Sequence, residues 1–128
     1  MLFRSARLEK IGQKIQELKL AISGKDFDTV GRIAEAEALE FHAITMTSTP
    51  SLIYWIPSSL RLVKLVQKWR AAGLPVYFNL NTGQDVHILC QSKDVPEVEQ
   101  RLKELDFVKR VIVNKPSVGT RLTDEHLF

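Results

Sequence analysis

The stretch VYFNLNTGQDVHILC, residues 76–90, decides the fold of this 128-residue chain. Two apolar runs, residues 76–80 and 86–90, flank a polar centre around Gly83. Apolar runs of this length on either side of turn-forming residues predict a strand, a tight loop and a second strand. By composition alone, loop 81–85 is interpreted as a turn that reverses the chain.

Helical patterns lie on both sides of this hairpin. Apolar residues recur every three or four positions in residues 4–23, 26–46, 59–72 and 94–105, which predicts four helices. In the first of them the apolar stripe consists of Leu8, Ile11, Ile15, Leu18 and Ile22. Short apolar runs at residues 52–55 and 107–113 predict two further strands.

From residue 52 onward, the predicted order is β-α-β-β-α-β. This order is typical of an α+β, ferredoxin-like fold, in which two helices cover one face of a four-stranded antiparallel sheet. We expect a single domain over residues 1–128, made of a helical pair (1–48), the βαββαβ core (49–114) and a looser tail (115–128). The helical pair is expected to pack against the core.

Composition argues against several classes of protein. No apolar run approaches the roughly 18 residues that span a membrane, and the first residues do not form a signal peptide. The net charge is +3, and acids alternate with bases along the predicted helices, so no nucleic-acid-binding face is expected. The single cysteine, Cys90, fits a reducing compartment, and we expect a cytoplasmic location.

The common catalytic and metal-binding motifs are absent from the sequence. It has no glycine-rich phosphate loop, no cysteine or histidine pair at metal-ligand spacing and no nucleophile elbow, so no metal site is expected. His42, on a predicted helix, is interpreted as a packing or surface histidine. The residues alone therefore leave the function open, and one possibility is a non-catalytic ferredoxin-like ligand-binding or assembly module.

Three sequence elements, taken in order, carry a family resemblance. They are His42-Ala43-Ile44-Thr45, the segment from Thr49-Pro50 to Tyr54-Trp55, and Asn81-Thr82-Gly83-Gln84-Asp85. Together they resemble the C-terminal half of mevalonate diphosphate decarboxylases, members of the GHMP kinase superfamily. Those enzymes carry a His-Ala-Thr element, a Pro-Pro-aromatic-aromatic turn and a strand that ends in Asp-Ala-Gly-Pro-Asn. The closing stretch GTRLTDEHLF, residues 119–128, resembles the tails of some bacterial members.

The resemblance implies a two-domain enzyme of the mevalonate pathway of isoprenoid biosynthesis. ATP phosphorylates the tertiary hydroxyl of mevalonate diphosphate, and loss of that phosphate with carbon dioxide gives isopentenyl diphosphate. An N-terminal GHMP domain would supply the phosphate-binding loop for ATP and Mg²⁺. We therefore expect the isolated chain to be inactive and to hold no cofactor of its own. A related mevalonate-phosphate kinase without decarboxylation is the alternative, and a homodimer is possible.

The resemblance also assigns site residues to the hairpin loop. Asn81 stands at the position of the family's catalytic aspartate, and Gly83, Gln84 and Asp85 stand at predicted substrate-binding positions. Asparagine has nearly the shape of aspartate, but it is uncharged and takes up no proton near neutral pH. Asn81 can therefore orient a hydroxyl group but cannot act as a general base.

Overall fold

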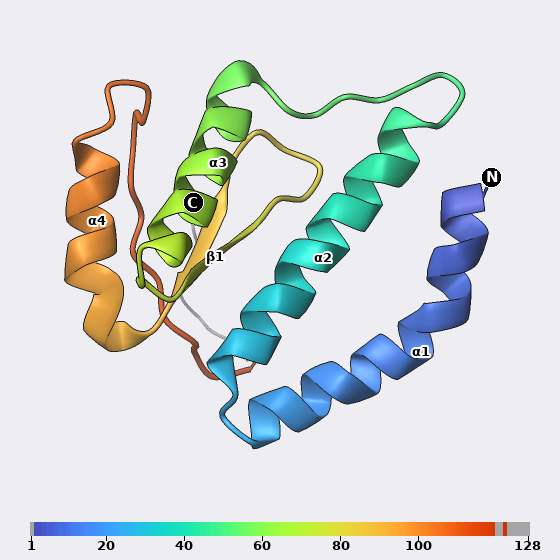
Figure 1. Ribbon diagram of the computed structural model, residues 1–128, viewed down its shortest axis with the longest axis horizontal. Coiled ribbons are helices and arrows are strands. Elements are labelled where there is room, and N and C mark those ends of the chain that lie inside the picture. The colour runs from blue at the N-terminus through green and yellow to red at the C-terminus, as the bar shows by residue number, and fades with distance from the viewer. Residues whose placement is uncertain (1, 120–121, 123–128) are drawn as a thin grey trace.

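The computed structural model describes residues 2–119 and 122, which form an α+β arrangement (Figure 1). Its elements are α1 (Leu2–Ser23), α2 (Phe27–Met46), α3 (Pro57–Ala71), β1 (Val76–Asn79), β2 (His87–Cys90), the 3-10 helix η1 (Ser92–Asp94) and α4 (Val95–Lys103). The predicted α+β class, the N-terminal helical pair and the hairpin are confirmed. In the predicted tail, residues 120–121 and 123–128 lie outside the described residues. None of the described helices is long and apolar enough to cross a membrane.

Local chemistry sets the ends of the helices. Asp26 caps α2, because its Oδ1 accepts a hydrogen bond from the backbone N–H of Thr29 at 3.1 Å. The predicted start of the third helix at Ser59 is wrong. α3 begins at Pro57, where a missing N–H costs no helical hydrogen bond. After α3, Gly73 has a φ of 98°, a left-handed conformation that glycine adopts without strain, and the chain turns into β1.

The predicted four-stranded sheet is wrong in the part of the chain that the structure describes. There, the sheet has two strands, and residues 52–55 and 107–113 form no strand. Some apolar side chains of these two segments, among them Trp55 and Phe107, nevertheless pack against the core. An apolar run is not sufficient for a strand, because a strand also needs a backbone partner in register.

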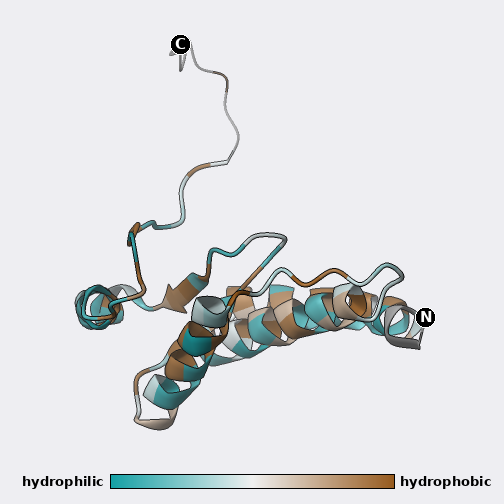
Figure 2. Cartoon of the chain, turned by 90° about the horizontal axis from the view of Figure 1, so that it is seen from above, coloured by the Kyte–Doolittle hydropathy of each residue, from teal (hydrophilic) through white to brown (hydrophobic). Residues whose placement is uncertain are grey.

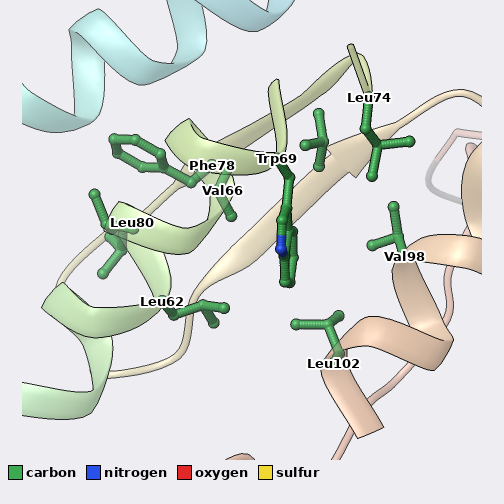
Figure 3. Packing of buried hydrophobic residues seen from close by; sticks show 10 residues of the cluster. Leu62, Val66, Trp69, Leu74, Phe78, Leu80, Val98 and Leu102 are labelled. Atoms are coloured by element: carbon green, nitrogen blue, oxygen red, sulfur yellow. The ribbon is translucent and has the colours of Figure 1, made fainter. Parts of the chain in front are cut away.

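The core lies between the hairpin, α3 and α4. β1 and β2 are antiparallel, with Phe78 opposite Ile88. Trp69 points from α3 toward Val98 and Leu102 of α4 (Figure 3). The buried cluster consists of Leu62, Val63, Val66, Trp69, Leu74, Val76, Phe78, Leu80, Val98 and Leu102.

The outer edge of β1 is closed by two side chains. Arg70 of α3 donates a hydrogen bond to the backbone carbonyl of Val76 at 2.8 Å, and Glu35 of α2 accepts one from the backbone N–H of Phe78 at 3.1 Å. Arg70 and Glu35 also form a bidentate ion pair, with N–O distances of 2.6 and 2.8 Å. Backbone groups left unpaired in this interior position would cost free energy. We call the Glu35–Arg70 pair the edge clamp, and it joins α2, α3 and β1.

One row of residues along α2 faces β1. This row is buried, although it is not the most apolar row of the helix. At Gly31, an added Cβ would come within 2.1 Å of the Tyr77 ring. The Tyr77 hydroxyl bonds to Asp28, and the guanidinium of Arg70 lies 4.5 Å from the centre of the Tyr77 ring. Burial, reinforced by Asp28, raises the pKa of Tyr77 to about 12. The buried residues of this row are Gly31, Glu35, Ala38 and His42.

α1 packs beside α2 through charged groups and leaves part of its apolar stripe exposed. Glu37 of α2 accepts hydrogen bonds from Arg7 at 2.6 Å and from Lys14 at 2.8 Å. Hydrophobic and hydrophilic residues are interleaved along both helices (Figure 2). The predicted apolar stripe of α1 is therefore only partly buried within the described chain, because three of its members remain exposed: Leu8, Ile15 and Ile22.

The contact between Gly31 and Tyr77 predicts opposite effects for two glycine-to-alanine substitutions. Gly31→Ala should lower the free energy of unfolding by about 1–3 kcal/mol, because the new methyl group overlaps a ring that its neighbours hold in place. Gly12→Ala, in α1, should raise it by about 0.5–1 kcal/mol, because the site is open and alanine is the better helix former. Urea unfolding of both variants gives the comparison. Equal effects would contradict this account of the Gly31 contact.

The edge clamp predicts a large loss of stability when one partner is removed. Glu35→Ala should cost about 3 kcal/mol in urea unfolding, because it leaves Arg70 and the Phe78 N–H without their partner. The control is Glu97→Ala on α4, which breaks an exposed ion pair with Arg101 and should cost about 0.5 kcal/mol or less. A loss at Glu35 no larger than that at Glu97 would show that the clamp does not hold the edge.

Candidate functional site

An open pocket lies where the hairpin loop meets the segment before α3. Its volume is about 420 Å³. The polar loop forms one wall, and residues 53–54 form the other. The loop residues are exposed, so a ligand can reach their polar groups. The lining consists of Ile53, Tyr54, Thr82, Gly83, Gln84 and Asp85.

Three of the four predicted site residues come together at this pocket. Gly83, Gln84 and Asp85 all line it. Asn81, the predicted catalytic residue, is exposed but is not part of the lining. It stands at the base of the loop and directly follows Leu80, whose side chain is fully buried. The base of the loop is therefore fixed in the core, while its tip reaches the pocket.

The first turn of α3 holds the far side of the loop. The hydroxyl of Ser59 donates a hydrogen bond to the backbone carbonyl of Gln84 at 3.0 Å. Ser59 is only 3% exposed, so this bond is shielded from water. From the sequence, Ser59 was predicted only as a helix start, because an apolar pattern carries no information about bonds between distant segments.

Tyr54 and His42 adjoin the site, and neither was predicted as a site residue from the sequence. Tyr54 lines the pocket. Its ring stacks on the Phe41 ring, with ring centres 6.3 Å apart, and its centre lies 6.1 Å from that of the His42 ring. His42 is 1% exposed, so of the two interpretations offered for it, packing holds and a surface position does not. Desolvation lowers the pKa of His42, and the backbone of Leu80 acts in the opposite direction. For Tyr54, the sequence signal was its place in the aromatic run that carries the family resemblance.

The donor groups of the described residues do not form a magnesium–ATP centre by themselves. No three His, Cys, Asp or Glu side chains come together in the described part of the chain, and Asp85 is the one carboxylate of the pocket lining. Magnesium sites in nucleotide-binding enzymes combine one or two carboxylates with phosphate oxygens and water. The pocket therefore does not fit this centre without groups from elsewhere.

The helical pair, the hairpin with its polar loop and the helices packed on it define a C-terminal domain of the GHMP superfamily type. The chain belongs to the family described as the mevalonate 5-diphosphate decarboxylase C-terminal domain, whose model matches residues 2–120. The resemblance identified from the three sequence elements is thus confirmed. This membership favours a part of an enzyme over an unrelated ferredoxin-like module.

Individual relatives agree with the family match. A phosphomevalonate decarboxylase from Haloferax volcanii is 32% identical over 100 residues, covering 77% of this chain and 31% of the relative. The structure of the mevalonate diphosphate decarboxylase from Enterococcus faecalis is 34% identical, with a TM-score of 0.77 over 84% of this chain and 33% of that one. The structure of the mevalonate diphosphate decarboxylase from Staphylococcus aureus is 33% identical, with a TM-score of 0.75 over 82% of this chain and 32% of that one. The chain spans about a third of the length of these relatives.

The bond between Ser59 and Gln84 predicts a local effect on the pocket loop. Ser59→Ala should lower the free energy of unfolding by about 1 kcal/mol and speed hydrogen exchange in loop 81–85, because a buried hydrogen bond is lost. Ser58→Ala is the matched control and leaves that bond intact. Hydrogen exchange read by NMR checks the effect, and unchanged loop protection in Ser59→Ala would refute the anchoring role.

Proposed function

We propose that this chain is the C-terminal domain of an ATP-dependent, diphosphomevalonate decarboxylase-like carboxy-lyase, which converts a mevalonate phosphate to an isoprenoid precursor. The observation that carries the proposal is the hairpin loop. In a chain of this family, the loop that resembles the aspartate loop forms one wall of an open pocket. The whole activity needs a larger protein, since the relatives are about three times longer.

The proposed reaction has two stages. The γ-phosphoryl group of ATP passes to the tertiary hydroxyl oxygen, ADP is the leaving group, and the hydroxyl proton passes to solvent. The C–O bond then breaks and phosphate departs with its electrons. The bond to the carboxylate also breaks, so carbon dioxide departs while the electrons of that bond form the C=C double bond. Asn81 orients the hydroxyl through its amide in the first stage, and it accepts no proton.

Two substrate classes fit the relatives. The relative from Haloferax volcanii is a phosphomevalonate decarboxylase, whereas those from Schizosaccharomyces pombe and Debaryomyces hansenii are diphosphomevalonate decarboxylases. The substrate is thus a mevalonate monophosphate or diphosphate. The second candidate function, a mevalonate-phosphate kinase that releases no carbon dioxide, is favoured by one observation, the uncharged Asn81 at the aspartate position.

The proposed partner is an N-terminal GHMP domain that holds ATP and Mg²⁺. A solved structure of MDDEF, 34% identical to this chain, contains MVAPP, AMPPCP and magnesium. Ile53 of the pocket wall and its neighbour Leu52 are 70% and 47% exposed, so they offer apolar contact area to such a domain. Gln84 and Asp85 supply the polar contacts to substrate. A homodimer and a cytoplasmic location remain part of the proposal.

The proposal predicts separable effects at Asn81 in the enzyme that unites this chain with its N-terminal domain. Asn81→Ala should lower phosphoryl transfer more than it weakens ATP binding, because the amide orients the hydroxyl. If the missing charge limits decarboxylation, Asn81→Asp should raise carbon dioxide release by roughly 10²–10⁴-fold, the contribution of a positioned general base. Parallel assays of ADP formation and carbon dioxide release, on the monophosphate and the diphosphate, give both quantities.

The outcomes distinguish the candidate functions. ADP formation without carbon dioxide in the unsubstituted enzyme and in Asn81→Asp supports the kinase. Carbon dioxide release by the unsubstituted enzyme supports the decarboxylase. If neither substitution changes either rate, the loop is only a turn and the proposed role of Asn81 is wrong. Gln91→Ala, at an exposed position beyond β2, is the control for non-specific effects.

A further inference from the structure

His42 of α2 carries a polar atom that the packing leaves without a partner. The residue is 1% exposed, and its Nε2 has no hydrogen-bond partner among the described residues. Buried polar atoms are almost always hydrogen-bonded, because leaving one unpaired costs free energy. A plain packing role does not require a histidine here, so the imidazole calls for a specific explanation.

The other side of the ring engages the strand that leads into the pocket loop. The backbone of Leu80 favours the protonated imidazole, so the group that faces the ring is an acceptor, the Leu80 carbonyl. Because Nε2 has no partner, we assign this contact to Nδ1. Burial keeps the imidazole neutral, and a neutral ring with its proton on Nδ1 has an acceptor at Nε2.

A matching donor lies next to this acceptor. The indole Nε1 of Trp55 is also buried without a partner among the described residues. The ring centres of His42 and Trp55 are 4.9 Å apart. An indole N–H only donates, so it complements an imidazole nitrogen that only accepts. A small rotation, or one buried water between the two nitrogens, satisfies both atoms.

We propose that His42 is a positioning residue of the pocket. In this proposal, its Nδ1–H holds the Leu80 carbonyl at the base of loop 81–85, and its Nε2 accepts a hydrogen bond from Trp55, directly or through one water. The same imidazole thus sets the relative position of the two pocket walls, since Tyr54, next to Trp55, lines the opposite wall. His42 is not part of the pocket lining, so it acts through these neighbours.

Any effect of His42 on turnover rests on the proposed function. The link that His42 forms between Leu80 and Trp55 does not. The test therefore uses the 128-residue chain without substrate or partner domain. Failure of the link and failure of the proposed reaction are then observed in separate experiments.

The first measurement is the tautomer of His42. Imidazole ¹⁵N spectra at pH 7 should show a neutral ring with its proton on Nδ1, and the signals are assigned by their loss in His42→Asn. Trp55→Phe should shift the Nε2 resonance, because it removes the donor. A charged ring, a proton on Nε2, or a Nε2 signal that ignores Trp55→Phe would overturn the proposal.

The second measurement is hydrogen exchange in loop 81–85. His42→Phe keeps an aromatic ring but removes both nitrogens, so loop amides should exchange about fivefold faster, the factor expected for one net hydrogen bond. His42→Asn places an amide donor near the former Nδ1 and should restore protection, whereas amides of α4 should not change in either variant. Equal loop exchange in the native chain and in His42→Phe would overturn the proposal. If His42→Phe does not fold, the tautomer measurement decides.

Discussion

The structure depends on how the backbone groups along the outer edge of β1 are hydrogen-bonded. β2 pairs with one edge of this strand, and side chains of α2 and α3 meet the other. The edge clamp supplies a charged donor to Val76 and a charged acceptor to Phe78, while the two clamp residues neutralise each other. A buried ion pair is usually a poor source of net stability, because desolvation offsets its attraction. Here the same atoms also bind the backbone, so removing either residue would expose several unsatisfied groups at once.

This edge explains why α2 buries polar residues. Its row against β1 has Glu35 and His42 seven positions apart, on the same face of the helix. Glu35 accepts a hydrogen bond from the backbone of Phe78, and the proposed contact of His42 is with Leu80, two residues further along the chain and just beyond β1. Alternate residues of a strand direct their backbone groups to the same edge. The helix thus covers the outer edge of the strand up to the base of the loop, and Gly31 lets Tyr77 lie close to the helix.

The elements with local sequence signals were predicted correctly. The predictions failed where hydrogen bonds or strand pairing depend on groups distant in the sequence. Helical periodicity and the two apolar runs around Gly83 were sufficient for the four helices and the hairpin, apart from the start of α3. Apolar periodicity predicted the helix α2 but not the polar members of its buried row, Glu35 and His42. The pattern also predicted strands at 52–55 and 107–113, because an apolar run carries no information about backbone pairing. Loop residues 83–85 were found through family resemblance, since their own composition indicates only a turn.

The geometry of the candidate site follows from two anchors rather than from contacts within the loop. Residues 81–85 are all exposed, so they make little packing of their own. The buried Leu80 fixes one end, and Ser59 holds the carbonyl of Gln84 near the other. An asparagine-to-aspartate change at position 81 therefore alters charge at a site whose position is set elsewhere. A substitution in the loop can therefore change its chemistry without repacking the core, because the exposed loop residues and the buried residues that anchor the loop are different residues.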